Sequence, residues 1–199
     1  IRLLKNYDVK PIFAQQSIRE LNLTGRSYRS VLNDVTWAVF QEGYKGGYGA
    51  DGDHLKTQTE VKMALDEGFT MLTLDCSEHI DNNIPNLSET EINKQFTKLP
   101  QEETKRVQAK YLNKTFNING YGITFSELDL KRVTLIYGRA IEFAVKIYNK
   151  NIAQSKNNID FEMSIDETLT STSPQAHFFV AKELFDADVK PVTIAPRFC

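Results

Sequence analysis

Short apolar runs alternate with segments of helical periodicity along almost the whole chain. Five apolar runs predict β-strands at residues 11–14, 48–51, 69–75, 159–165 and 192–194. The spacing of apolar residues and of helix-capping residues predicts helices at residues 27–42, 57–68, 88–98, 102–112, 126–147 and 173–184. Strands separated by helices pair in parallel through right-handed crossovers, so the pattern is typical of an α/β fold.

Residues that favour helix ends and tight turns stand where these elements are expected to stop. Thr57 and Glu60 have the spacing of a capping box, and Gly68 is placed to end the same helix. Asn119-Gly120 lies between two short stretches of apolar–polar alternation, which predicts a β-hairpin within residues 115–125.

Two architectures fit this order of elements. One is an incomplete (β/α)8 TIM-type barrel with about five βα units, and the other is an open doubly wound sheet. No Gly-x-Gly-x-x-Gly opens a helix after the first strand, which weakens the dinucleotide-binding version of the second. We expect residues 1–199 to form a single partial (β/α) barrel domain. An irregular insertion is expected at about 78–125, because long excursions after a strand commonly decorate the active-site face of a barrel.

Composition and charge argue against several classes of protein. The formal net charge is -2 with both signs interspersed, so nothing indicates a nucleic-acid partner. No stretch approaches the roughly 18 unbroken apolar residues of a membrane span, and residues 1–5 do not resemble a signal peptide. Cys76 and Cys199 are expected to be free thiols in preference to a disulfide. We therefore expect a cytoplasmic protein, with assembly into a homo-oligomer left open.

The glycine-rich segment at residues 48–56 is the strongest candidate for chemistry. Asp53 and His54 follow Gly52, where we expect the backbone to leave regular strand geometry, so that both side chains can face one pocket. A neutral imidazole is a good ligand for a divalent transition metal, and carboxylates complete such sites. Alternatively, Asp53 acts as a general base. The competing interpretation is a histidine that caps or packs in a loop.

Polar side chains also follow the other predicted strands, where parallel α/β enzymes hold their catalytic residues. These are Gln15, Gln16, Ser17, Asp75, Cys76, Ser77, Glu78, His79, Asp166, Glu167 and Thr168. Any one of them is also compatible with a capping role. Glu167 is the best candidate for a second proton-transfer group, and Arg197 suits an anionic substrate group. We expect the substrate to contact Gln15, Gln16, Asp51, Lys56 and Arg197. His79 is a weaker ligand candidate, and His177 is expected to be structural.

Several segments, in the same order along the chain, carry a resemblance to a known family. They are PIFAQQS at residues 11–17, TWAVFQEGY at 36–44, GADGDH at 49–54, EGFTM at 67–71, DET at 166–168 and TSP at 172–174. Together they resemble the tagaturonate epimerase family, metal-dependent bacterial enzymes of hexuronate breakdown. The resemblance covers most of the chain and is weakest at residues 79–125.

The resemblance implies a substrate, a cofactor and residue roles. It implies interconversion of D-tagaturonate and D-fructuronate, which are C4 epimers, with a divalent metal cation as cofactor. Residue by residue, it implies that Asp53 is the proton acceptor, His54 a metal ligand and Glu167 the proton donor. The remaining ligands are expected beyond Cys199, which agrees with an absent initiator Met in predicting a fragment of a longer chain. The alternatives are a metal-dependent sugar aldolase or isomerase on the same barrel, and an inactive fragment that lacks its full metal site.

Overall fold

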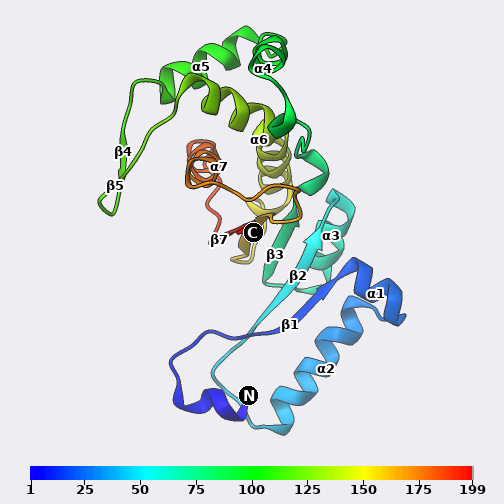
Figure 1. Cartoon of the computed structure of the whole chain (residues 1–199). Helices are drawn as coiled ribbons and strands as arrows, with labels where there is room; N and C mark the ends of the chain where they lie inside the picture. The colour runs from blue at the N-terminus through cyan, green and yellow to red at the C-terminus, as the bar shows by residue number, and fades with distance from the viewer. Residues whose placement is uncertain (199) are drawn as a thin grey trace. The chain divides into compact units, whose positions relative to one another are not determined.

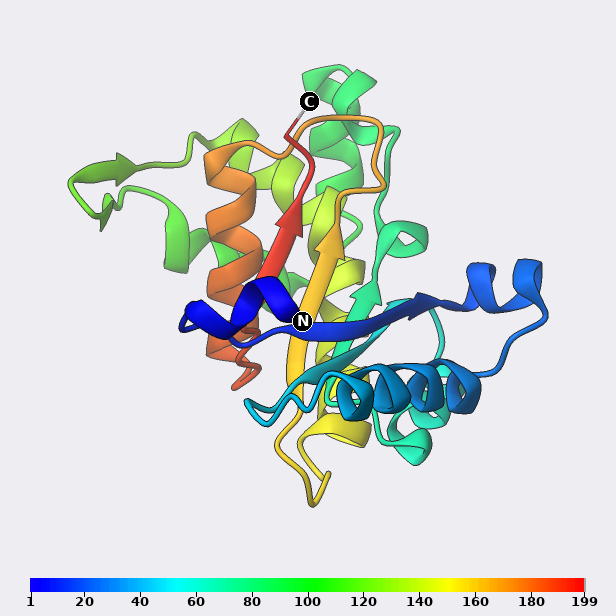
Figure 2. The same cartoon turned by 90° about the horizontal axis from the view of Figure 1, so that it is seen from below.

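A computed structural model describes residues 1–198, in which a parallel sheet is combined with helices (Figure 1). Within these residues the strands of the larger sheet lie in the order β1-β2-β3-β6-β7, and β1, β2, β3 and β6 pair in parallel. Figure 2 shows β3 and β6 running in the same direction. The strands are β1 Ile12–Ser17, β2 Gly49–Leu55, β3 Met71–Asp75, β6 Asp160–Ile165 and β7 Thr193–Pro196.

Helices occupy the connections between these strands. They are α1 Ile18–Thr24, α2 Tyr28–Gln41, α3 Gln58–Glu67, α4 Glu89–Phe96, α5 Gln101–Tyr111, α6 Glu127–Ile147 and α7 Pro174–Asp186. Shorter helical turns are η1 Arg2–Asn6, η2 Ser77–His79, η3 Ile84–Asn86 and η4 Tyr148–Ile152. A separate antiparallel hairpin is formed by β4 Phe116–Ile118 and β5 Tyr121–Ile123.

The chain divides into two compact units, and each is described by itself. The sheet unit comprises residues 1–75, 147–164 and 191–193, and therefore carries β1, β2, β3 and most of β6. The helical unit comprises residues 76–146, 165–190 and the C-terminal residues from Ile194. It holds α4, α5, α7, nearly all of α6 and the hairpin. The single barrel domain, with an insertion at about 78–125, stays a prediction.

In the sheet unit, α3 packs very closely on β2. Val61 and Ala64 of α3 and Leu72 of β3 are at most 1% exposed. A Cβ atom on Gly52 would lie 3.0 Å from the Ala64 Cβ and 3.3 Å from the Leu72 Cδ2. Glycine at position 52 is therefore required by the close approach of helix and strand.

The predicted helix ends and the predicted turn are confirmed. Thr57 and Glu60 form a reciprocal capping box at the start of α3, and Gly68 ends the helix with φ +99°. In the hairpin, Asn119 and Gly120 have φ of +50° and +90°. These values suit a tight hairpin turn, in which two successive residues adopt the left-handed region.

The first two strands are longer than predicted, and one helix was not predicted. β1 continues to Ser17 and β2 to Leu55, so Gln15, Gln16, Asp51 and Asp53 lie inside strands and not beyond their ends. The sequence signal that could have revealed α1 is the spacing of Ser17 and Glu20, which form a capping box in the structure.

An ion-pair network centred on Glu183 links two helices of the helical unit. This side chain of α7 is 8% exposed. Its carboxylate accepts hydrogen bonds from Lys110 at 2.6 Å and from the Tyr111 hydroxyl at 2.7 Å, and Arg106 lies 2.7 Å away. Burial opposes ionisation of Glu183, but the bonds from Lys110, Tyr111 and Arg106 outweigh it and lower the pKa. The network therefore joins α5 to α7.

The α/β class with a parallel sheet is confirmed, whereas closure into a TIM-type barrel stays a prediction. Of the helices in residues 1–198, none combines the length and the apolar character needed to cross a membrane.

Candidate active site

The candidate site is built around a bulge in β2. Gly52 pairs with Leu72 of β3, but the next pair joins Leu55 to Leu74, so β2 has one extra residue. His54 takes up this irregularity with φ +51°, in the left-handed region that residues with a Cβ rarely adopt. A bulge re-aims the side chains around it, and strained backbone of this kind concentrates at functional sites. The prediction that the chain leaves regular geometry after Gly52 is confirmed.

Asp53 and His54 form a pair at this bulge. The His54 Nδ1 lies 2.8 Å from the Asp53 Oδ1. The Asp53 side chain is 17% exposed and that of His54 32% exposed, so solvent reaches both. With the proton on Nδ1, the imidazole donates to the Asp53 carboxylate, and this hydrogen bond holds the ring in one orientation. Histidines that bind metals commonly have a carboxylate partner of this kind. The arrangement tests neither the predicted role of Asp53 as proton acceptor nor that of His54 as metal ligand.

A row of polar side chains crosses the sheet two residues before Asp53. The carboxylate of Asp51 is buried, and the Thr73 hydroxyl of β3 lies 3.0 Å from its Oδ2 and 3.2 Å from its Oδ1. The same hydroxyl lies 3.4 Å from the Glu162 Oε1 of β6. The Thr193 hydroxyl donates to Glu162 Oε2 at the end of the row. We call Asp51, Thr73, Glu162 and Thr193 the polar row.

Burial raises the pKa of Asp51 to about 6. Hydrogen bonds from Thr73 oppose this rise, and the negative charges of Asp53 and Glu162 add to it. A carboxyl group whose pKa is strongly shifted beside other charged groups is characteristic of functional sites, although structural networks produce the same effect. Asp51 is 3% exposed. Its contact with substrate stays a prediction.

Lys56 lies beside a second buried carboxylate. Its Nζ is 3.2 Å from the Asp75 Oδ2, and the Asp75 side chain is 1% exposed whereas that of Lys56 is 37% exposed. The ammonium therefore compensates the buried charge and still meets solvent. Its predicted contact with substrate stays open.

The predicted residues on β1 take part in the start of α1. The Gln16 side chain donates to the Glu20 carboxylate at 2.9 Å, and Ser17 caps the helix. The Gln15 side chain is exposed. These contacts explain the local structure of Gln16, and the substrate-binding role predicted for Gln15 and Gln16 is not tested by them.

Glu167 and Arg197 belong to the helical unit. Glu167 is exposed in the loop after β6, where Thr168 is buried and its hydroxyl donates to the Thr170 carbonyl at 2.9 Å. The Arg197 guanidinium donates to the Thr168 carbonyl, and the Arg197 backbone N–H donates to the Thr172 hydroxyl at 3.1 Å. Arg197 therefore supports the loop that carries Glu167. Its predicted contact with an anionic substrate remains a prediction.

The other histidines and the described cysteine have packing contacts. His79 stacks on Phe143 with ring centroids 4.1 Å apart. His177 lies on α7, where burial lowers its pKa. Cys76 is buried and takes part in no disulfide among residues 1–198, and Cys199 lies outside the described residues.

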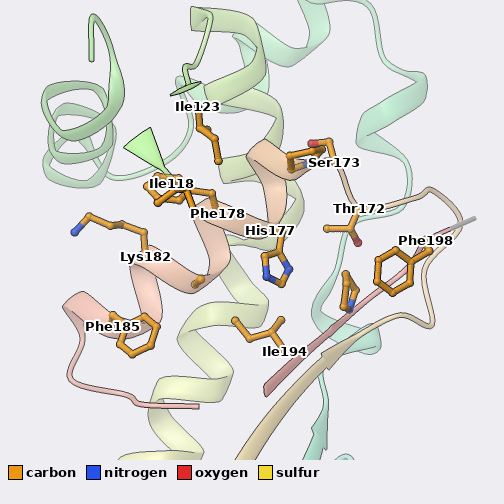
Figure 3. A pocket seen from close by; sticks show the side chains of 13 residues that line it. Ile118, Ile123, Thr172, Ser173, His177, Phe178, Lys182, Phe185, Ile194 and Phe198 are labelled. Carbon is orange, nitrogen blue, oxygen red and sulfur yellow. The ribbon is translucent and has the colours of Figure 1, made fainter. Parts of the chain in front are cut away.

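An apolar groove of about 800 Å³ lies in the helical unit. Figure 3 shows His177 and Phe178 of α7 lining it together with Ile118 of the hairpin and Ile194. The lining is mostly aliphatic and aromatic, and it contains none of the residues predicted for catalysis, metal or substrate binding. The groove therefore has different chemistry from the bulge in β2.

The residues described here fit one position of a metal site. His54 provides one imidazole, but residues 1–198 contain no group of three or more His, Cys, Asp and Glu side chains placed to hold a metal ion. Metal dependence therefore stays a prediction for this chain.

Three members of the polar row, Thr73, Glu162 and Thr193, are absent from the candidates that the sequence indicates, and Thr73 is the central one. It bridges Asp51 and Glu162, which are 111 positions apart in sequence, so only the pairing of the strands brings them together. The available signal was a threonine between Leu72 and Leu74, at the centre of a strand that is otherwise buried and apolar there.

Comparison with known proteins adds family membership to this geometry. The family model described as "UxaE: tagaturonate epimerase" matches residues 1–199. A curated tagaturonate/fructuronate epimerase of Thermotoga maritima is 43% identical over 198 residues. That match covers 100% of this chain and 40% of the relative, so the chain spans about two fifths of the relative's length.

Crystal structures of a fructuronate-tagaturonate epimerase from Cohnella laeviribosi have the same fold over nearly all of the chain. The structure with one glycerol bound is 50% identical with a TM-score of 0.97, and the native structure is 49% identical with a TM-score of 0.97. Each comparison covers 99% of this chain and 40% of the solved chain. The family model, the curated relative and the solved structures agree: the chain belongs to the tagaturonate epimerase family.

Proposed function

We propose that this chain forms part of an epimerase that interconverts tagaturonate and fructuronate. The relatives that match the whole chain are named for these two sugar acids. The structural observation that carries the proposal is the bulge in β2, where a strained His54 is hydrogen bonded to Asp53. A binding protein without chemistry has no evident need for a histidine held at a positive φ.

The proposed role of Asp53 is to accept a proton from the substrate. Tagaturonate and fructuronate differ at C4, and the C4 hydrogen is not adjacent to the C2 ketone, so simple enolisation does not make it acidic. A retro-aldol route avoids this difficulty. Asp53 takes the C4 hydroxyl proton, the C3–C4 bond breaks, and its electron pair moves into an enediolate at C2 and C3. Re-addition to the other face of the C4 aldehyde, followed by return of the proton to the C4 oxygen, gives the epimer.

The proposed role of His54 is to provide one metal ligand through Nε2, while Nδ1 remains bonded to Asp53. A divalent cation would supply Lewis-acid stabilisation of negative charge that develops on the substrate oxygens. Asp53 would meanwhile keep the imidazole in the orientation and tautomer that this role requires. The identity of the cation and its other ligands are further parts of the proposal.

Glu167 is proposed as the proton donor, on the basis of the family resemblance. Its exposed position allows exchange of protons with solvent, and the contacts of Thr168 and Arg197 hold the surrounding loop. Substrate contacts by Gln15, Gln16, Asp51, Lys56 and Arg197 are proposed from the places of these polar side chains at or near the ends of predicted strands. A cytoplasmic location, a barrel and a homo-oligomer also remain predictions.

The proposal is tested by assaying epimerisation of tagaturonate by the intact protein and its variants. Loss of a positioned acid or base typically costs about 10²–10⁴-fold in rate, so Asp53→Asn and Glu167→Gln are each expected to lose activity on this scale. Asp66→Asn on α3 is the matched control, because this exposed carboxylate pairs only with Lys62 among the described residues. Full activity in either of the first two variants contradicts the assigned roles.

Isotope incorporation separates the retro-aldol route from direct proton transfer at carbon. The retro-aldol route retains the C4 hydrogen, because only the C4 hydroxyl proton is removed. Epimerisation in deuterated water followed by NMR should therefore show no deuterium at C4. Deuterium at C4 would establish direct deprotonation of that carbon. Cleavage to separate products without epimerisation would favour an aldolase.

A further inference from the structure

In the polar row, three carboxylate oxygens lie within hydrogen-bond distance of the Thr73 hydroxyl, which has one hydrogen to donate. The single hydroxyl hydrogen of Thr73 faces two oxygens of Asp51, at 3.0 and 3.2 Å, and the Glu162 Oε1 at 3.4 Å. If both carboxylates are ionised, the Thr73 hydroxyl can donate to only one of them, while the Thr73 backbone N–H also stabilises ionised Asp51. The oxygen of the other carboxylate then faces a hydroxyl lone pair.

One additional proton completes this hydrogen-bond pattern. When Asp51 carries it, Asp51 donates to the Thr73 hydroxyl and Thr73 donates to Glu162 Oε1. Thr193 already donates to Glu162 Oε2, so both oxygens of Glu162 are then satisfied. The row becomes a directional chain from β2 through β3 to β6. Asp51 and Thr73 are buried, whereas Glu162 is half-buried and Thr193 is exposed. Buried polar groups are stable when every one is satisfied, so the need for the additional proton falls on the buried Asp51–Thr73 pair.

The surroundings of Asp51 also favour a neutral carboxyl group. Asp53 on its own strand and Glu162 on β6 place negative charge near it, and the Tyr28 hydroxyl of α2 is also within electrostatic range. The charge of Asp75 on β3 is compensated by Lys56. Burial, followed by these charges, raises the pKa of Asp51 to about 6, which agrees with the hydrogen count.

We propose that Asp51 shares a proton with Glu162 through the Thr73 hydroxyl and acts as a positioning residue that adjusts the charge beside Asp53. The proposal goes beyond the assigned acid and base, and its catalytic part rests on the proposed function. A proton on Asp51 removes one negative charge from the region in which Asp53 and an anionic sugar acid must coexist. Asp51 need not touch the substrate to have this effect.

Binding and protonation are then reciprocal. A sugar-acid anion near Asp53 favours the protonated form of Asp51, so binding takes up protons from the buffer, at most one per site. The proton comes from solvent and returns to it when the ligand leaves. Calorimetric titration of tagaturonate in buffers of different ionisation enthalpy should reveal this uptake at pH 7, and Asp51→Asn should abolish it.

The direct test is a carboxyl titration of the intact protein labelled with ¹³C at the side-chain carboxyl of aspartate. One aspartate signal is expected to titrate with a midpoint near 6, and it should be missing in Asp51→Asn. Glu162→Gln removes a neighbouring charge and should lower the midpoint by about one unit. Asp66→Asn, which changes an exposed carboxylate, should leave the signal in place.

Each outcome supports the inference or overturns it. Absence of any aspartate titrating above pH 5 overturns proton sharing. A midpoint near 6 that Glu162→Gln leaves unchanged overturns it as well, since burial alone would then explain the shift. If Asp51→Asn does not fold, Thr73→Val tests the same bridge. Because the proposed bridge acts through the Thr73 hydroxyl, the change in midpoint that Glu162→Gln causes should be smaller in the Thr73→Val background than in the unmodified protein, and an equal change contradicts the role of Thr73.

The titration does not depend on catalysis. If the protein has no epimerase activity but still shows the coupled titration, the proposed function is refuted and the proposal of a shared proton is supported. Conversely, an active epimerase whose pH–rate profile is the same in Asp51→Asn and in the unmodified protein would remove the positioning role. The two failures are therefore distinguishable.

Discussion

Replacing His54 by glycine and by alanine separates the strain at this residue from its chemistry. Both substitutions remove the imidazole and its hydrogen bond to Asp53. They differ in the backbone, because only alanine retains a Cβ atom at a position with φ +51°. The comparison between the two variants therefore measures the cost of holding a side chain in the left-handed region.

The expected difference follows from two opposing effects. A Cβ in the left-handed region costs about 1–2 kcal/mol, which glycine avoids. Glycine in turn loses more chain entropy on folding, about 0.5–1 kcal/mol relative to alanine. We expect His54→Gly to be more stable than His54→Ala by about 1 kcal/mol. At Gln15, an exposed residue of β1 without a positive φ, we expect the opposite order, with glycine less stable by about 0.5–1 kcal/mol.

Urea denaturation of the intact protein, followed by circular dichroism, provides the comparison. With a slope of about 2 kcal/mol per molar urea, the His54 pair should differ in midpoint by about 0.5 M. The Gln15 pair measured in parallel provides the control for glycine itself. If His54→Ala is at least as stable as His54→Gly, the bulge does not strain residue 54, and the structural argument for the site fails.

Other substitutions test the packing and the charges of the fold. Gly52→Ala should destabilise the protein by about 1–3 kcal/mol, because the new methyl would press on α3. In α6, Gly138→Ala should stabilise the protein by up to about 1 kcal/mol, since the atom nearest to the new Cβ would be 3.8 Å away. Thermal unfolding measures both changes in stability. If Gly52→Ala and Gly138→Ala changed the stability in the same direction, this packing argument would be refuted. Glu183→Gln should cost about 2–3 kcal/mol at pH 7, because it weakens hydrogen bonds with Lys110 and Arg106. The pKa of Glu183 is lowered by folding from 4.5, so its contribution is present above about pH 4.5 and is lost as the pH falls through the folded-state value. Urea midpoints measured from pH 3 to 7 should therefore fall less steeply towards low pH for Glu183→Gln than for the unmodified protein. If the midpoints of the two proteins fell in parallel, the role of the network would be contradicted.

Local sequence signals were sufficient to predict the ends of several elements. The cap at Thr57 and the turn at Asn119-Gly120 each involve residues within four positions of one another. Such interactions do not depend on the rest of the fold, so composition and spacing reveal them. The order of strands and helices likewise predicted parallel pairing.

The geometry of the site needed the three-dimensional structure. The left-handed conformation of His54 arises because β2 must restore its pairing with β3 after Gly52, and no short motif encodes that register shift. The link between Asp51 and Glu162 through Thr73 depends on strands distant in sequence. The capping role of Ser17 was available in the sequence, but residues 15–17 were interpreted as a strand end with catalytic potential.

The positive φ at residue 54 also bears on how sequence variation at this position should be interpreted. A library of all amino acids, scored only for the abundance of folded protein, should enrich glycine and asparagine, because these residues enter the left-handed region most readily. The same library scored for activity should return histidine. Position 54 would therefore separate selection for stability from selection for chemistry within a single experiment, since the two favour different residues there.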